Sequence, residues 1–79
     1  MRTYLINLRS KAGYSRKKVA REAGLSLQHY SRLESGDRGG KVSFLIMGRI
    51  CEVFGVSLDS IYPLEKEYQE KLELEKETN

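Results

Sequence analysis

Apolar residues recur at helical spacing along the first part of residues 15–36. Val19, Ala20 and Ala23 lie three and four positions apart, so they share one face of a short helix. Gly24 interrupts this pattern, as a glycine does where a helix ends with a positive φ angle. The small side chain of Ala20 suits a position where two helices cross. The pattern therefore predicts a helix that ends at a tight turn.

A second short helix is predicted directly after this turn. Ser26 is a suitable N-terminal cap, and Tyr30 and Leu33 form the apolar face of the residues that follow. Two short helices joined by a few residues around a glycine form a helix-turn-helix. The polar face of the second helix carries side chains that can hydrogen-bond to base edges and phosphates, namely Gln28, His29, Ser31 and Arg32.

Helices are also predicted before and after this pair. Residues 3–12 form the first, with Leu5 and Leu8 inward and Gly13 at its end. Ser43 caps another helix over residues 44–54, after a glycine-rich loop at residues 36–43. The inward residues expected on that helix are Phe44, Met47, Ile50, Cys51 and Phe54. Leu45 and Ile46 make it apolar over more than one face, which indicates partial cover by a partner.

The end of the chain is predicted as a short helix followed by a charged tail. Residues 58–62 form the fifth helix, which Pro63 is expected to end. Beyond it, Leu64, Tyr68 and Leu72 lie at helical spacing among Glu and Lys residues. We therefore expect one all-α domain at residues 1–63 and a short helical extension at residues 64–79.

Composition narrows the class of protein. The chain has 79 residues, 39% of them apolar, and no apolar run long enough to span a membrane. No secretory leader is recognisable, and the single cysteine, Cys51, fits a reducing cytoplasm. One histidine and one cysteine cannot build a structural metal site, and no catalytic spacing is present. We expect a cytoplasmic protein that is not an enzyme and has no metal, cofactor, small-molecule ligand or membrane partner.

Charge is divided unevenly along the chain. Residues 1–63 hold eleven Lys and Arg against five Asp and Glu, whereas residues 64–79 hold three Lys against six Glu. Arg16, Lys17 and Lys18 lie in the first turn of the predicted helix after Ser15, where cations oppose the helix dipole. This arrangement is favourable if phosphates approach that end, although a solvated basic turn is the simpler alternative. A basic body favours double-stranded DNA as the partner.

Three segments together carry a family resemblance: LRSKAGYSRKKVAREAGLS, YSRLESG and ICEVFGVSLDSIY. Residues 5–62 resemble the Cro/repressor-type helix-turn-helix family of phage and bacterial regulators. The resemblance implies a compact five-helix domain that binds a palindromic operator as a symmetric dimer, with the third helix in the major groove.

The resemblance also implies roles for individual residues. Arg9 and Glu34 match a pair that forms a buried salt bridge between the first and third helices. The residues matching base-contacting positions are Leu27, Gln28, His29 and Arg32. The residues expected to contact DNA phosphates are Arg16, Lys17, Ser26, Ser31, Arg38 and Lys41.

The chain departs from the family pattern at several positions. Leu27 is apolar where a polar base-reading residue is usual, and Arg16 replaces a common glutamine. Tyr30 replaces a smaller branched residue at a packing position. The loop at residues 36–43 is about two residues longer than typical.

Two functions remain open on the sequence alone. The first is a DNA-binding transcriptional regulator, in particular a repressor. The second is a protein-interaction module on the same scaffold, such as an antitoxin or antirepressor. We expect a homodimer formed by the fourth and fifth helices and the tail, through Leu45 or Ile46, Leu58, Ile61, Tyr62, Leu64, Tyr68 and Leu72. The alternative is a tail that folds back on a monomer, which pairs only on DNA.

Overall fold

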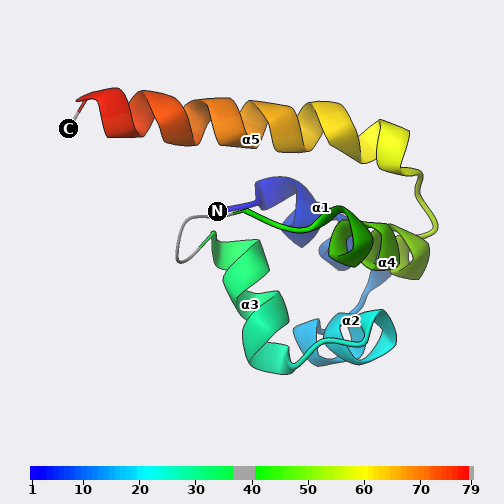
Figure 1. The fold of residues 1–79 in the computed structure, drawn as a ribbon. Helices are drawn as coiled ribbons and strands as arrows, with labels where there is room; N and C mark the ends of the chain where they lie inside the picture. Colours follow the sequence, from blue (N-terminus) through cyan, green and yellow to red (C-terminus); the bar gives the residue numbers. More distant parts are fainter. Residues whose placement is uncertain (37–40, 79) are drawn as a thin grey trace.

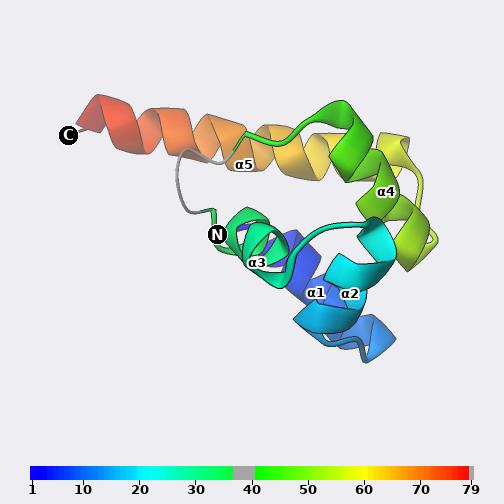
Figure 2. The same cartoon turned by 60° about the horizontal axis from the view of Figure 1, so that its bottom comes forward.

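The computed structural model describes residues 1–36 and 41–78, which form five helices and no strand (Figure 1). The helices are α1 (Thr3–Ala12), α2 (Arg16–Ala23), α3 (Leu27–Ser35), α4 (Phe44–Phe54) and α5 (Leu58–Thr78). In both ribbon views, α5 lies across one side of the bundle and its C-terminal end projects beyond it, while α2 lies on the opposite side; α3 runs from α2 toward α5 (Figures 1 and 2). The all-α architecture and the first four helices agree with the sequence prediction.

Local signals in the sequence account for the helix boundaries. Ser15 and Ser43 cap α2 and α4, because their hydroxyl oxygens accept from the backbone N–H of Lys18 (3.1 Å) and Ile46 (3.2 Å). Gly24 ends α2 with φ of 73°, which lets the chain turn sharply into α3. These predicted caps and the predicted turn are confirmed.

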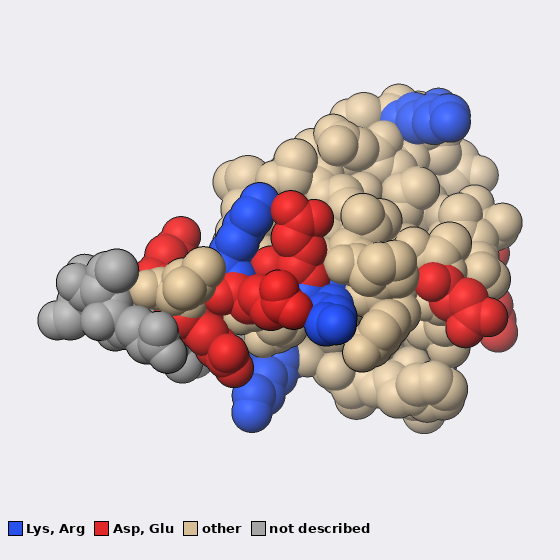
Figure 3. Space-filling model, turned by 90° about the horizontal axis from the view of Figure 1, so that it is seen from above, with Lys and Arg blue, Asp and Glu red and all other residues tan. Residues whose placement is uncertain are grey.

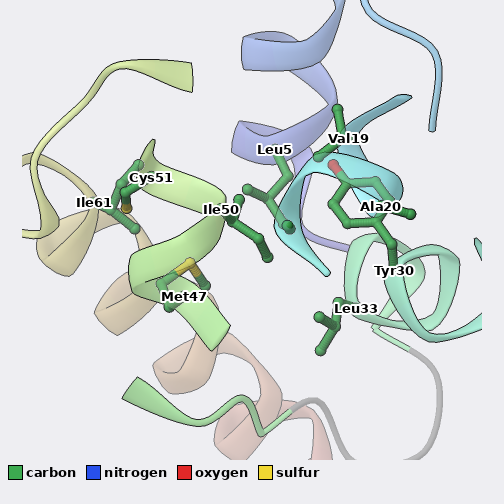
Figure 4. Close-up of a cluster of buried hydrophobic side chains, with 10 residues drawn as sticks. Leu5, Val19, Ala20, Tyr30, Leu33, Met47, Ile50, Cys51 and Ile61 are labelled. Carbon is green, nitrogen blue, oxygen red and sulfur yellow. The ribbon is translucent and has the colours of Figure 1, made fainter. Parts of the chain in front are cut away.

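All five helices contribute side chains to one core (Figure 4). Tyr30 of α3 and Val19 of α2 are fully buried in it, and the small Ala20 beside them is 2% exposed. The other members of this core cluster are Leu5, Ala23, Leu33, Met47, Ile50, Cys51 and Ile61. Because α3 buries Tyr30 and Leu33 in this core, its opposite face is turned outward and held in place.

The prediction that the fifth helix ends at Pro63 is wrong. Helix α5 continues to Thr78 with Pro63 inside it, although an interior proline costs about 3 kcal/mol. Contacts made beyond the proline offset this cost: Glu65 pairs with the buried Arg2, with Nε to Oε1 at 2.8 Å, and Tyr68 is 8% exposed. The division of the chain at residue 63 into a domain and a tail stays a prediction.

Two further expectations about apolar positions are wrong. Phe44 is 79% exposed instead of inward, because it lies in the first turn of α4 and forms one wall of an open groove. Ile61 and Tyr68, expected at a dimer contact, are 3% and 8% exposed within the single chain. They therefore offer almost no surface to a second copy.

Candidate nucleic-acid interface

The outward face of α3 presents the residues that the family resemblance assigns to base contacts. Gln28, His29 and Arg32 are exposed, and Leu27 is 48% exposed at the first position of the helix. Ser26 caps α3, since its hydroxyl oxygen accepts from the backbone N–H of His29 (3.0 Å). The first turn of α3 therefore displays several hydrogen-bonding side chains on one side of the molecule.

The carboxylate of Glu34 joins three helices beneath this face. Arg9 of α1 donates to it through Nε (2.9 Å to Oε2) and Nη2 (2.9 Å to Oε1). Arg16, at the start of α2, donates to it through Nε (3.0 Å to Oε1). Glu34 is fully buried, whereas the Arg9 and Arg16 side chains are 19% and 48% exposed. The network fixes the start of α2 and the last turn of α3 relative to α1.

Burial and charge shift the pKa values within this network in opposite directions. Burial alone would raise the pKa of Glu34, but the hydrogen bonds from Arg9 and other donors outweigh it and hold the pKa below its ordinary value. Burial, with the Glu34 carboxylate nearby, raises the pKa of Tyr30. Glu34 is therefore ionised, and Tyr30 neutral, wherever the protein is folded near neutral pH.

The folded protein is expected to lose stability in acid. The pKa values of Glu34 and Glu65 both lie below the ordinary 4.5, so the unfolded chain takes up protons first as the pH falls. The stabilisation is complete above the unfolded value and is lost as the pH falls through the folded values. Urea unfolding at pH 6 and pH 3.5 measures this loss.

A paired variant shows whether these two carboxyls cause the acid sensitivity. Glu34→Gln/Glu65→Gln should flatten the pH profile, whereas Glu67→Gln, which alters a side chain that is 64% exposed, should keep the wild-type profile. An unchanged profile in the double variant would assign the acid sensitivity to other groups.

The basic residues at the start of α2 differ in their surroundings. Arg16 uses Nε on Glu34, while nearly half of its side chain faces solvent. Lys17 is exposed, and the Nζ of Lys18 lies 4.5 Å from the centre of the Tyr14 ring, a cation–π contact. Arg16 and Lys17 are therefore accessible to an anion, whereas Lys18 is in contact with Tyr14.

The remaining residues expected at phosphates lie on different segments of the chain. Ser31 is half-buried, and Lys41 is exposed before α4. Arg38 lies outside the described residues. Within residues 1–36 and 41–78, no three His, Cys, Asp or Glu side chains come together as a metal site, and no helix is long and apolar enough to cross a membrane.

Sequence reasoning missed one residue that supports this face, Arg2. Its backbone N–H donates to the carbonyl of Glu34 (2.8 Å), and its Nη1 donates to the carbonyl of Leu33 (2.6 Å). The side chain is fully buried. No local signal marks it, because an arginine next to a chain end normally indicates a solvated charge.

Comparison with known proteins identifies the scaffold. Residues 5–61 match the family model described as helix-turn-helix. The chain is 30% identical over 67 residues to an uncharacterized HTH-type transcriptional regulator, YgzD, of Bacillus subtilis (strain 168), covering 85% of this chain and 98% of that protein. No solved structure gives a significant match.

Proposed function

The chain belongs to the Cro/C1-type helix-turn-helix family of DNA-binding transcriptional regulators, and on this premise we propose that it represses transcription from a palindromic operator. In this proposal α3 lies in the major groove, and Gln28, His29 and Arg32 contact base edges. One observation carries it: these exposed polar side chains lie on a helix whose other face is locked by Tyr30 and Glu34. Side chains with no part in the core are thus held in a fixed direction.

The placement of charge supports the same orientation on DNA. In a view onto α5, acidic side chains gather along that helix with lysines among them (Figure 3), and the six Glu of residues 64–79 outnumber the three Lys. Arg16 and Lys17 begin α2, on the side of the bundle opposite α5 (Figure 1), and Arg32 lies on the exposed face of α3. A polyanion is repelled from α5 and attracted to α2 and α3.

We further propose that the protein acts as a homodimer through the surface between α4 and α5. Phe44 and Tyr62, which face each other across this surface, are 79% and 66% exposed, and Leu45, next to Phe44 in the first turn of α4, is 62% exposed. A groove of about 310 Å³ runs between the two helices; its apolar lining is Val42, Phe44, Met47, Leu58, Ile61 and Tyr62, and Ser43, Asp59 and Glu65 also line it. Covering this surface with a second copy removes it from water and doubles the base pairs read.

Repression requires only that the dimer occupies its site. A bound dimer excludes other proteins from the same stretch of DNA, whereas activation requires a further contact with the transcription machinery. The residues that support the proposal serve DNA binding and self-association, which suffice for exclusion.

Arg32→Ala is expected to weaken binding to the specific site by about 1–3 kcal/mol, because arginine pairs with guanine through two hydrogen bonds. Preference should relax at one base pair of each half-site. Lys17→Ala should weaken binding to all sequences alike and reduce the salt dependence. Fluorescence anisotropy on genomic fragments selected by the protein, against random DNA, measures both.

The opposite pattern would reassign these residues. Equal losses on specific and random DNA for Arg32→Ala would make Arg32 a phosphate contact. Absence of any selected fragment would contradict the DNA-binding proposal. The open apolar groove between α4 and α5 would then favour the second candidate, a protein-interaction module of antitoxin or antirepressor type.

A further inference from the structure

Arg2 caps the C-terminal end of α3 from outside the helix. The last carbonyls of a helix have no partner within it, and a positive charge near them is favourable. Arg2 supplies donors to two of them, its backbone N–H to Glu34 (2.8 Å) and its Nη1 to Leu33 (2.6 Å). The order of this last turn therefore depends on where Arg2 lies.

The same side chain is held by α5. Its Nε donates to Glu65 Oε1 (2.8 Å) and its Nη2 donates to Glu65 Oε2 (3.0 Å), which makes a two-bond pair. The guanidinium also lies over the Tyr68 ring, 4.6 Å from its centre. Because Arg2 is fully buried, these contacts stabilise a charge that is removed from water.

Two more contacts tie α5 to the same place. The Tyr4 hydroxyl of α1 donates to Glu65, so the carboxylate is also fixed from the α1 side. Gly36, the residue that ends α3 with φ of 78°, packs so closely on α5 that a Cβ there would overlap the Tyr68 hydroxyl. The middle of α5 thus lies directly against the end of α3.

We propose that Arg2 is a positioning residue that couples the docking of α5 to the order of α3, and so to DNA affinity. When α5 leaves its place, Arg2 loses Glu65 and the Tyr68 ring, and its charge is drawn toward water. The carbonyls of Leu33 and Glu34 then lose their donors. That turn also carries the Glu34 carboxylate, which holds the start of α2.

The coupling acts in both directions. Any ligand that orders α3 must also favour docked α5, by the same factor. A second copy bound at Tyr62, within one turn of Glu65, would stabilise docked α5 and with it the end of α3. The DNA side of this inference rests on the proposed function; the link between the two helices does not.

Hydrogen exchange on the free full-length protein tests the link itself. Glu65→Gln should speed amide exchange about tenfold or more at the end of α3, including the Gly36 N–H that donates to Arg32, and along α5. Amides in the middle of α2 should keep their wild-type rates. The matched control is Glu67→Gln, which makes the same change on the exposed side of α5.

Two results would overturn the proposal. One is exchange at the end of α3 that stays within twofold of the control while α5 is loosened. The other is an equal increase in the amide exchange rate in all five helices, because that pattern indicates global unfolding instead of coupling between two helices. If Glu65→Gln does not fold, Arg2→Lys, which keeps the charge but not the two-bond fork, should give the same local pattern in milder form.

DNA binding gives the second arm of the experiment. DNA added to the wild type should slow exchange around Glu65, on the side of the bundle away from the proposed interface. Glu65→Gln should bind the selected site about tenfold more weakly than Glu67→Gln. Equal DNA affinities of Glu65→Gln and Glu67→Gln would overturn the coupling but not the proposed function. A wild type that binds no DNA would overturn the proposed function, and the hydrogen-exchange test on the free protein would still apply.

Discussion

Glu34→Ala is expected to lower the free energy of unfolding by about 3–5 kcal/mol. Glu34 is fully buried and accepts three hydrogen bonds from Arg9 and Arg16. Its removal leaves two guanidinium groups without this carboxylate and opens a space beside Tyr30. For a domain of this size the melting temperature should fall by about 12–40 °C, as followed by circular dichroism.

A double-mutant cycle separates the pair from the cavity. Arg9→Ala/Glu34→Ala should cost less than the sum of the two single changes, because the second change removes a charge that is already unpaired. Glu52→Ala, which removes an exposed carboxylate from α4, should melt close to the wild type. A Glu34→Ala variant that also melts within a degree or two of the wild type would mean that the network contributes nothing to stability.

Local signals were enough to predict most of the fold. Ser15, Gly24 and Ser43 mark boundaries of α2 and α4 through contacts within a few residues, so these boundaries could be predicted from the sequence. The length of α5 could not be predicted in this way. Pro63 is a local signal to stop, and it is overridden by contacts with Arg2, which is 63 residues away from Glu65.

The candidate interface also has features that the sequence predicts and features that it does not. The outward row on α3 follows from the periodicity that turns Tyr30 and Leu33 inward. The family resemblance indicated that Arg9 meets Glu34, and the two side chains lie in contact. The contact of Arg16 with the same carboxylate was not predicted, because the glutamine common in the family at this position suggested a phosphate contact. The role of Arg2 depends on three segments meeting in space, which no spacing along the chain reveals.

The surface between α4 and α5 also shows why burial is hard to predict at the end of a helix. Phe44 shares the helical face of Cys51, but it lies two turns earlier, at the first position of α4. It is therefore exposed next to Tyr62. Ile61, the residue before Tyr62, belongs to the core and is buried. The apolar surface available to a partner is thus shifted toward the start of α4.

Leu45→Glu is expected to dissociate the proposed dimer and to weaken binding to a two-half-site operator by about 100-fold or more. Leu45 is 62% exposed in the single chain, so the change opens no cavity, and an acidic residue in the first turn of α4 favours the helix dipole. A charge in an apolar contact is costly to desolvate. Each half-site carries about half of the specific binding energy. A single chain contacts one half-site only, so loss of the partner removes the contribution of the other half-site.

Sedimentation at micromolar concentration, followed by titration of the operator, measures both effects. The wild type should sediment at twice the chain mass of 9.1 kDa and should prefer half-sites whose centres lie about 34–36 Å apart. Leu45→Glu should sediment at the single-chain mass and lose that preference for spacing. Ser10→Glu, an equal change of charge at an exposed position of α1, should remain dimeric. A wild type that sediments at single-chain mass would contradict this interface, since the apolar surface of α4 and α5 would then be open in the free protein.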